Sequence, residues 1–170
     1  MPILSGEWGY SSHTKGVSLE TQAAFAVRQQ LSNLLNNVPL SIWYDWKNDG
    51  ADPNENEHNF GTVLPDLKPK PAYTAIKTLM SELSGYRIAR RLPIPNEKDY
   101  VLICTNTTGA QKLAAWTQDE PHSAGLDLTL KNADKVRGVT GDGESFTPTI
   151  DSGHLVLDLR PAPRYVSLGL

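Results

Sequence analysis

The chain has 170 residues, a net charge of −3 and an apolar fraction of 39%. This length suits one medium domain or two small ones. The near balance of 16 basic and 19 acidic side chains gives no electrostatic reason to expect binding to nucleic acid or to an anionic membrane.

The first residues, the apolar runs and the cysteine content indicate the cellular compartment. The first residues lack a basic region and a long apolar core, so we expect no signal peptide. No stretch approaches the roughly 18 apolar residues of a membrane span. The only cysteine, Cys104, cannot form an internal disulfide and follows the apolar run Val101–Ile103, which predicts a core thiol. We expect a soluble cytoplasmic chain, and export of a longer parent protein stays open.

The first element in chain order is a short apolar run, Ile3–Leu4, that leads through small residues to Glu7 and then to Trp8, Gly9 and Tyr10. This pattern predicts a buried strand that ends at Glu7 and opens into a loop. A carboxylate at the C-terminal end of a strand, surrounded by aromatic rings, is typical of the catalytic end of a (β/α)8 barrel.

A helix is predicted next. Ser18 offers an N-cap, and the helix runs to about Asn37 before Pro39 ends the pattern. One buried stripe is expected from residues three or four apart, and Arg28, Gln29, Gln30, Ser32 and Asn33 are expected to face water. The stripe consists of Ala24, Val27, Leu31, Leu34, Leu35 and Val38.

A second strand and helix follow. The aromatic and β-branched run Leu40–Trp46 lies between Pro39 and Asn48-Asp49-Gly50 and predicts a strand. The polar loop from Lys47 to Lys70 is long enough to suggest a function. Pro71 suits a first helical turn, and Gly85 is expected to cap the end. The buried stripe of this helix is Ala72, Ile76, Leu79, Met80 and Leu83.

From Arg87 onward, short runs separated by Asn, Asp, Gly or Pro predict six or seven strands without intervening helices, which is typical of a small antiparallel sandwich. These runs are 100–105, 112–117, 125–130, 135–140, 145–150 and 154–159. The fold class is therefore α/β plus all-β, with two βα units over residues 1–86 and a β-sandwich over 87–170. Two parallel strands leave apolar faces and edges uncovered, so we expect a missing barrel segment or self-association.

Four motifs resemble the C-terminal part of a clan A retaining glycoside hydrolase of family 39 or family 5. They are Ser5–Ser11, Trp43–Gly50, Glu57–Gly61 and Lys68–Tyr73. The resemblance covers the whole chain and implies the seventh and eighth βα units of a TIM barrel followed by a sandwich. It further implies that Glu7 is the nucleophile and that a Trp at the end of the eighth strand floors a sugar subsite.

The chain departs from this family pattern at the acid/base. The families keep that residue on an Asn-Glu pair after the fourth strand, and here Asn54-Glu55 and Asn56-Glu57 lie in the long loop while Asn96-Glu97 lies at the domain junction. Retaining hydrolysis requires two carboxyl groups roughly 5–5.5 Å apart. Glu57 is a weak candidate for the second one, and another chain is the alternative source.

Other side chains are candidates for binding sugar. Trp46 is preferred as the stacking platform because it lies nearer the end of the predicted strand, with Trp43 equally consistent with core packing. Tyr10 is a hydrogen-bonding partner for Glu7 or a structural hydroxyl. Trp8 adjoins Glu7. The remaining candidates for contacts with sugar hydroxyls are Asp49 and His58, in a loop otherwise expected to be solvated.

No metal or cofactor is expected. An EF-hand starting at Asp45 would have Lys47 at its third position and Asn56 at its twelfth, which lack the carboxylates that the template uses there. The histidines show no zinc spacing. The sequence predicts a glycosidase of carbohydrate metabolism, or a truncated part of one, with a carbohydrate substrate. The alternative is a catalytically silent carbohydrate-binding or structural fragment that self-associates to complete a barrel, and Glu7 alone is also consistent with a simple capping or pairing role.

Overall fold

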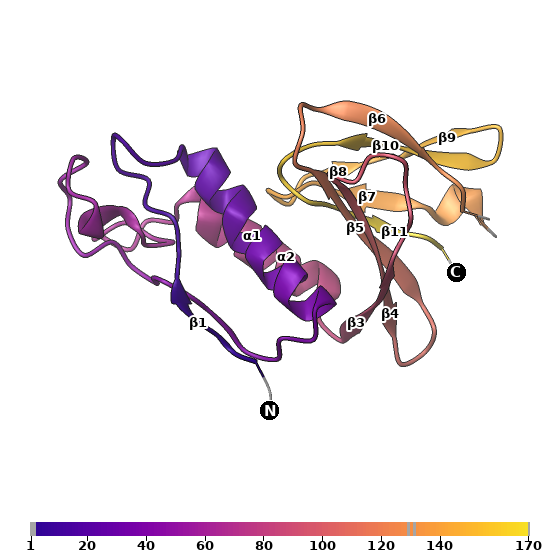
Figure 1. Cartoon of the computed structure of the whole chain (residues 1–170). Coiled ribbons are helices and arrows are strands. Elements are labelled where there is room, and N and C mark those ends of the chain that lie inside the picture. Colours follow the sequence, from indigo (N-terminus) through magenta and orange to yellow (C-terminus); the bar gives the residue numbers. More distant parts are fainter. Residues whose placement is uncertain (1–2, 129, 131, 170) are drawn as a thin grey trace. The chain divides into compact units, whose positions relative to one another are not determined.

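The computed structural model describes residues 3–128, 130 and 132–169 (Figure 1). The chain divides into two compact units, Met1–Thr78 and Leu79–Leu170, here called the N-terminal and C-terminal units. Within the described residues, no helix is both long and apolar enough to cross a membrane.

The N-terminal unit alternates strands and helices. Its elements are β1 (Ser5–Trp8), α1 (Leu19–Leu35), β2 (Ser41–Trp43), the 3₁₀ turn η1 (Glu57–Asn59) and α2 (Pro71–Leu83), which continues into the C-terminal unit. The predicted N-cap of α1 is confirmed, because the Ser18 hydroxyl accepts a hydrogen bond from the Thr21 backbone amide at 3.1 Å. Gly85 follows α2 with a φ of +78°, a conformation that suits glycine.

β1 and β2 pair in parallel in a sheet of two strands. Trp8 pairs with Trp43, and the Tyr44 amide donates to the Trp8 carbonyl oxygen at 3.0 Å. The sheet is shorter than predicted, because regular pairing ends at Trp43 and Asp45–Trp46 instead bond to Phe60, Thr62 and Val63 of the long loop. Face alternation therefore cannot be extended from β2 to Trp46.

Several predictions of burial in the N-terminal part are wrong. Ile3 and Leu4 precede β1, which begins at Ser5, and are 73% and 57% exposed. Leu34 and Met80 are also exposed, although periodicity placed them on buried stripes. Gln29 is buried, and its side-chain amide donates to the Ser41 hydroxyl at 3.3 Å, which joins α1 to β2.

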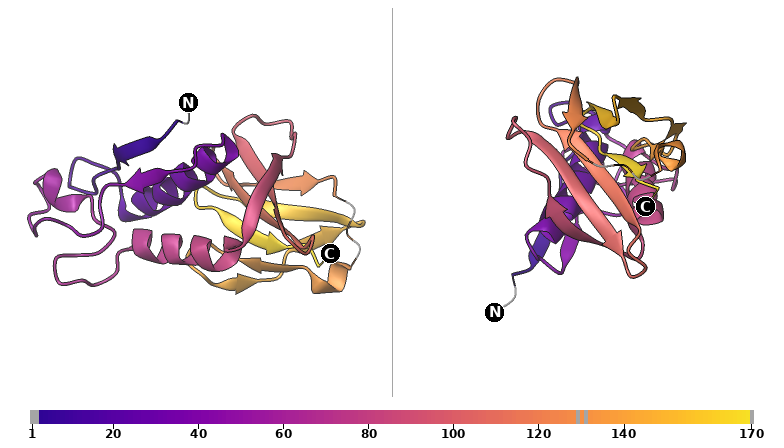
Figure 2. Two further views of the ribbon diagram at one scale, coloured as in Figure 1. Left: turned by 90° about the horizontal axis from the view of Figure 1, so that it is seen from below. Right: turned by 90° about the vertical axis from the view of Figure 1, so that its right-hand side faces the viewer.

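The C-terminal unit is a β-sandwich of two antiparallel sheets (Figure 2). The larger sheet has the order β3-β4-β5-β11-β7-β8, and the smaller has the order β6-β10-β9. The bounds are β3 (Tyr86–Arg91), β4 (Asp99–Asn106), β5 (Gln111–Thr117), β6 (His122–Leu126), β7 (Arg137–Val139), β8 (Ser145–Phe146), β9 (Thr149–Asp151), β10 (His154–Leu159) and β11 (Arg164–Ser167), with a 3₁₀ turn η2 (Ala133–Lys135).

The predicted runs match most of these strands but not all. The run 125–130 lies mostly beyond β6, which starts at His122, and part of it falls outside the described residues. The run 145–150 is two short strands in different sheets. Two strands were not predicted: β3, an edge strand with three arginines, and β11, which follows the proline-rich 161–163. Charge on an edge and proline beside a strand hide the usual alternation.

One apolar cluster fills the space between the two sheets. It contains Leu126, Leu155, Leu157 and Leu159 from the smaller sheet. The larger sheet contributes Val101, Ile103, Leu113, Ala115 and Val166. Cys104 on β4 is buried, as predicted, and burial raises its thiol pKa to about 11.

Candidate functional site

Glu7 lies on β1, where it pairs with Ile42 of β2. Its side chain is exposed, and it makes no hydrogen bond or ion pair with the part of the chain that the structure describes. The Tyr10 hydroxyl does not bond to it there. Gly9 is required just after the strand, because a Cβ atom at this position would lie 1.9 Å from the Tyr44 carbonyl oxygen. The two strand ends therefore approach closely beyond Glu7.

An aromatic cluster forms at these strand ends. The ring of Tyr10 lies 5.6 Å from that of Trp8, 6.4 Å from that of Trp43 and 4.6 Å from that of Phe25 on α1, measured between centroids. Trp8 remains 45% exposed, so part of the cluster faces solvent. The indole nitrogen of Trp43 is buried without a hydrogen-bond partner in the described residues. Trp8, Tyr10 and Trp43, three of the predicted sugar-binding residues, thus lie together. Trp8 follows Glu7 in the sequence, and Trp43 follows Ile42, the residue that pairs with Glu7.

Trp46 belongs to a different contact. Its ring meets that of Tyr73, in the first turn of α2, edge to face at 5.8 Å, and its side chain is 61% exposed. Among the aromatic contacts of the described residues, Trp46 is not joined to the Trp8–Tyr10–Trp43 cluster. Neither ring has a described contact with the Glu7 side chain.

Two other predicted residues, Asp49 and Glu57, lie near Tyr44 and Asp45. The Tyr44 hydroxyl donates to Asp49 Oδ2 at 3.4 Å. Burial, and then the charge of Asp49, raise the pKa of Asp45 to about 6, whereas Lys70 acts to lower it. Glu57 acts on both Tyr44 and Asp45 through its charge. No described contact joins Glu57 to Glu7, so the expected second carboxylate is not placed beside the first.

Two polar side chains hold this region together and were missed from the sequence. The Lys70 ammonium is buried and donates to Ser12 Oγ at 3.0 Å, Asn48 Oδ1 at 3.2 Å and the Asn59 carbonyl at 3.2 Å. Gln22 on α1 is fully buried, and its amide donates to the carbonyls of Tyr10, Asn59 and Phe60. The sequence held two signals of these buried groups. Lys70 stands between two prolines, and Gln22 stands beside Ala23 and Ala24.

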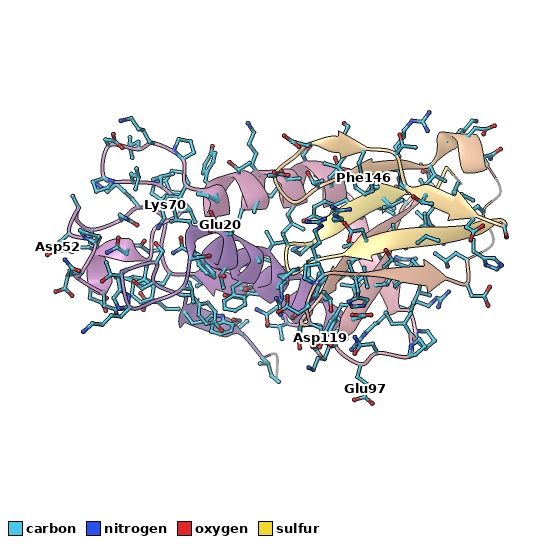
Figure 3. All side chains as sticks on the ribbon, turned by 90° about the horizontal axis from the view of Figure 1, so that it is seen from above. Glu20, Asp52, Lys70, Glu97, Asp119 and Phe146 are labelled. Carbon is cyan, nitrogen blue, oxygen red and sulfur yellow. The ribbon has the colours of Figure 1, made fainter. Side chains whose placement is uncertain are left out.

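Lys70 occupies an unusual place, at the junction of the long loop and α2 (Figure 3). Its carbonyl accepts hydrogen bonds from Tyr73 and Thr74, so it precedes the helix as its cap. A cation is unfavourable at a helix N-terminus. Burial lowers the pKa of Lys70 to about 8, and the Asp45 carboxylate opposes this change.

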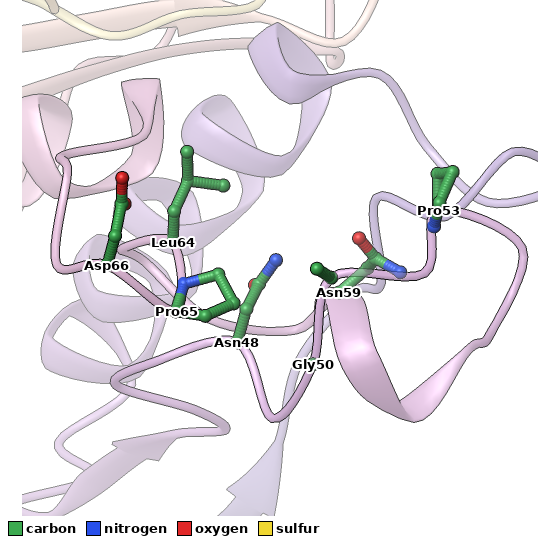
Figure 4. Close-up of a pocket in the computed structure, with 8 residues that line it drawn as sticks. Asn48, Gly50, Pro53, Asn59, Leu64, Pro65 and Asp66 are labelled. Atoms are coloured by element: carbon green, nitrogen blue, oxygen red, sulfur yellow. The ribbon is translucent and has the colours of Figure 1, made fainter.

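A pocket of about 500 Å³ opens in the long loop (Figure 4). Asn48 and Asn59, two of the three residues that accept from Lys70, line it together with Gly50, Leu64, Pro65 and Asp66. None of the predicted site residues lines this pocket. Within 3–128, 130 and 132–169, no group of three or more His, Cys, Asp or Glu side chains is arranged to hold a metal ion.

Comparisons with known proteins point to glycoside hydrolases. Neither protein-family models nor curated proteins gave a match. A solved family 39 glycoside hydrolase from the gut symbiont Bacteroides cellulosilyticus WH2 matches with a TM-score of 0.88 and 29% identity over 99% of this chain. The catalytic domain of GH30 xylanase C from Talaromyces cellulolyticus matches with a TM-score of 0.60 and 13% identity over 98% of this chain, a likeness of fold alone.

The chain spans about a third of the length of these solved proteins, 34% of the first and 40% of the second. The resemblance read from the four sequence motifs is confirmed by structure, since the family 39 enzyme superposes on nearly the whole chain. The chain is therefore similar, over both of its units, to a clan A glycoside hydrolase, and its size and fold are consistent with the C-terminal part of such an enzyme.

Proposed function

We propose that the chain is the C-terminal part of a retaining glycoside hydrolase, with the last two βα units of a barrel in residues 1–86 and the sandwich in 87–170. The observation that carries this proposal is the placement of Glu7 on a parallel strand whose end, with that of β2, bears the Trp8–Tyr10–Trp43 cluster. The likeness to the family 39 enzyme supports it.

In this proposal the Glu7 carboxylate attacks the anomeric carbon of a β-glycoside, and the leaving group departs with the bonding electron pair. Trp46, whose side chain is 61% exposed, supplies an apolar ring face for the sugar, with Trp43 as the alternative platform. A second carboxyl group, supplied by another chain, protonates ordinary leaving groups and later activates water. Glu57 is the weaker candidate for this group within the chain. Asp49 and His58 are proposed contacts with sugar hydroxyls.

The test avoids the missing acid by using a leaving group that needs no proton. Dinitrophenyl β-xyloside and β-glucoside release dinitrophenolate directly, so attack by Glu7 leaves a sugar ester on the protein. Intact-mass spectrometry is expected to show one added glycosyl group, which peptide mapping places on Glu7. Because deglycosylation also needs a base, the adduct is expected to accumulate.

The variants make this test specific. Glu7→Gln is expected to abolish the adduct, and Glu20→Gln, a matched change at an exposed site in the first turn of α1, is expected to leave it unchanged. In Glu7→Ala, added azide is expected to occupy the vacated space and give a glycosyl azide of inverted configuration. An adduct that persists in Glu7→Gln sinks the assignment of Glu7.

The exposed apolar side chains of the N-terminal unit favour a second candidate function, a catalytically silent fragment that self-associates. Ile3, Leu4, Leu40 and Ile42, on and before the two strands, are all at least 46% exposed. Light scattering would show an oligomer for this candidate. A stable monomer that unfolds cooperatively would remove it.

A further inference from the structure

Lys70 buries its ammonium group, and the residue itself immediately precedes the first turn of α2. Proteins keep such a group only where its partners compensate for the lost water. Its three N–H donors have three oxygen acceptors at 3.0–3.2 Å, which accounts for all of its hydrogen-bonding capacity.

The three acceptors come from separate parts of the chain. Ser12 lies in the loop after β1, Asn48 lies shortly after β2, and Asn59 ends the turn η1. Backbone hydrogen bonds from Ser12 to Asn59 and from Thr14 to Pro53 run between the same segments. Lys70 thus joins segments that follow two different strands.

We infer that Lys70 is a positioning residue that fixes the loop after β1 against the segment 48–60, and that it thereby sets the walls of the Asn48–Asn59 pocket. Asn48 presents its oxygen to Lys70 and is held in place with it, while Asn59 is held through its carbonyl. The same contact fixes η1, which carries Glu57 and His58. This role is independent of whether Glu7 reacts.

Hydrogen exchange of single amides tests this role. Lys70→Met keeps an unbranched side chain of similar volume, one atom shorter, and removes the charge and donors. We expect the amides of Ser12 and Thr14 to exchange at least about tenfold faster, because their bonds bridge the segments that Lys70 joins. The Asn48 amide, which donates to the Val63 carbonyl, is also expected to exchange faster, because the Asn48 side chain loses its bond to Lys70. Amides inside α1, such as Val27, are expected to keep their rates. Lys68→Met, two residues away and paired only with Asp66 on the surface, is the matched control and is expected to change nothing.

A second variant keeps the buried charge and removes the Ser12 hydroxyl, which accepts from the Lys70 ammonium and donates to the Asn59 carbonyl oxygen at 3.1 Å. Ser12→Ala removes one acceptor, so faster exchange is expected at Ser12 and Thr14 but not at Asn48. Unchanged rates in Lys70→Met overturn the inference. Faster exchange throughout α1 in both variants also overturns it, because Lys70 would then be needed for folding of the unit and not for placing its loops.

The pH dependence gives a readout that a simple packing role would not. A neutral amine has two N–H donors for three acceptors, so one link must be lost when Lys70 deprotonates. Asp45 is the charged group that acts on it among the described residues. Intrinsically corrected exchange at Ser12 and Asn48 is expected to accelerate as pH rises through about 8 in the wild type and not in Lys70→Met. A pH-independent rate in both proteins contradicts the inference.

Discussion

The two units of the chain differ in how far their large apolar side chains are buried. Of the eleven large apolar side chains that are exposed among the described residues, ten lie in the N-terminal unit and the other is Met80 on α2. From β3 onward the large apolar side chains of the described residues are buried or half-buried, and those of the core lie between the two sheets. The C-terminal unit completes its own core, whereas the N-terminal unit has apolar strands with surface left to cover.

The largest expected effect is a core truncation in the C-terminal unit. Leu113 on β5 is fully buried and packs in the core cluster, so Leu113→Ala is expected to lower the free energy of unfolding by about 3 kcal/mol. Leu40→Ala removes the same atoms from an exposed site and is expected to change it by less than about 0.5 kcal/mol. Urea unfolding measures both. An equal loss of unfolding free energy in the two variants would contradict the difference between the units.

A smaller effect is expected from changing an exposed apolar side chain of the N-terminal unit. If its strands are covered by another copy, Ile42→Ser is expected to weaken self-association about tenfold, or about 1.4 kcal/mol. Met80→Ser alters an exposed apolar side chain on α2 and serves as the control. Sedimentation equilibrium gives the dissociation constants. The same constant for wild type and Ile42→Ser would place the association elsewhere.

The smallest expected effect is a pH dependence within the sandwich. His122 on β6 places Nε2 at 2.9 Å from the buried Asp99 carboxylate on β4 and Nδ1 at 2.9 Å from the Glu120 carbonyl. The Glu120 carbonyl, and then Asp99, raise the pKa of His122 above its ordinary value of 6.5. The stabilisation by protonated His122 is therefore fully present below pH 6.5 and is lost as pH rises through the raised value.

The change His122→Gln is expected to lower the melting temperature more at pH 5.5 than at pH 9, as measured by differential scanning calorimetry at about those pH values. His154→Gln, at a histidine that is 58% exposed, is the control and is expected to show little difference between the two pH values. A pH-independent effect of His122→Gln would show that the imidazole contributes through packing alone.

Local patterns predicted much of the fold. The Ser18 cap, the two helices, the Gly85 stop and the central strands of the sandwich all have short-range signals, and the structure contains them. The predicted burial of Ile3 and Leu4 was wrong because burial depends on neighbours, and periodicity reports only which residues share a face. The partial barrel itself stays a prediction.

The candidate site was predictable only in part. The residues around Glu7 stand together in the sequence, so Trp8 and Tyr10 could be named from it. The partners of Lys70 are separated from it by as many as 58 positions, and no local pattern links Ser12 to Lys70. Gln22 was hidden for the same reason, because a buried polar side chain inside a helix looks like a water-facing one until its acceptors are known.

The buried thiol of Cys104 has a practical consequence. The chain has one cysteine, on β4 beside the edge strand β3 of the larger sheet, and burial raises its pKa to about 11. Cys104 alternates along the strand with the core residues Val101 and Ile103, so it lies on the face of the larger sheet turned away from the sandwich core. A thiol reagent at neutral pH can therefore modify the protein only while that strand is open to solvent. The rate of modification therefore reports how often this outer face of the larger sheet is uncovered, and not only the opening of the core between the two sheets. A single natural thiol thus reports the exposure of this face of the larger sheet without any engineered label.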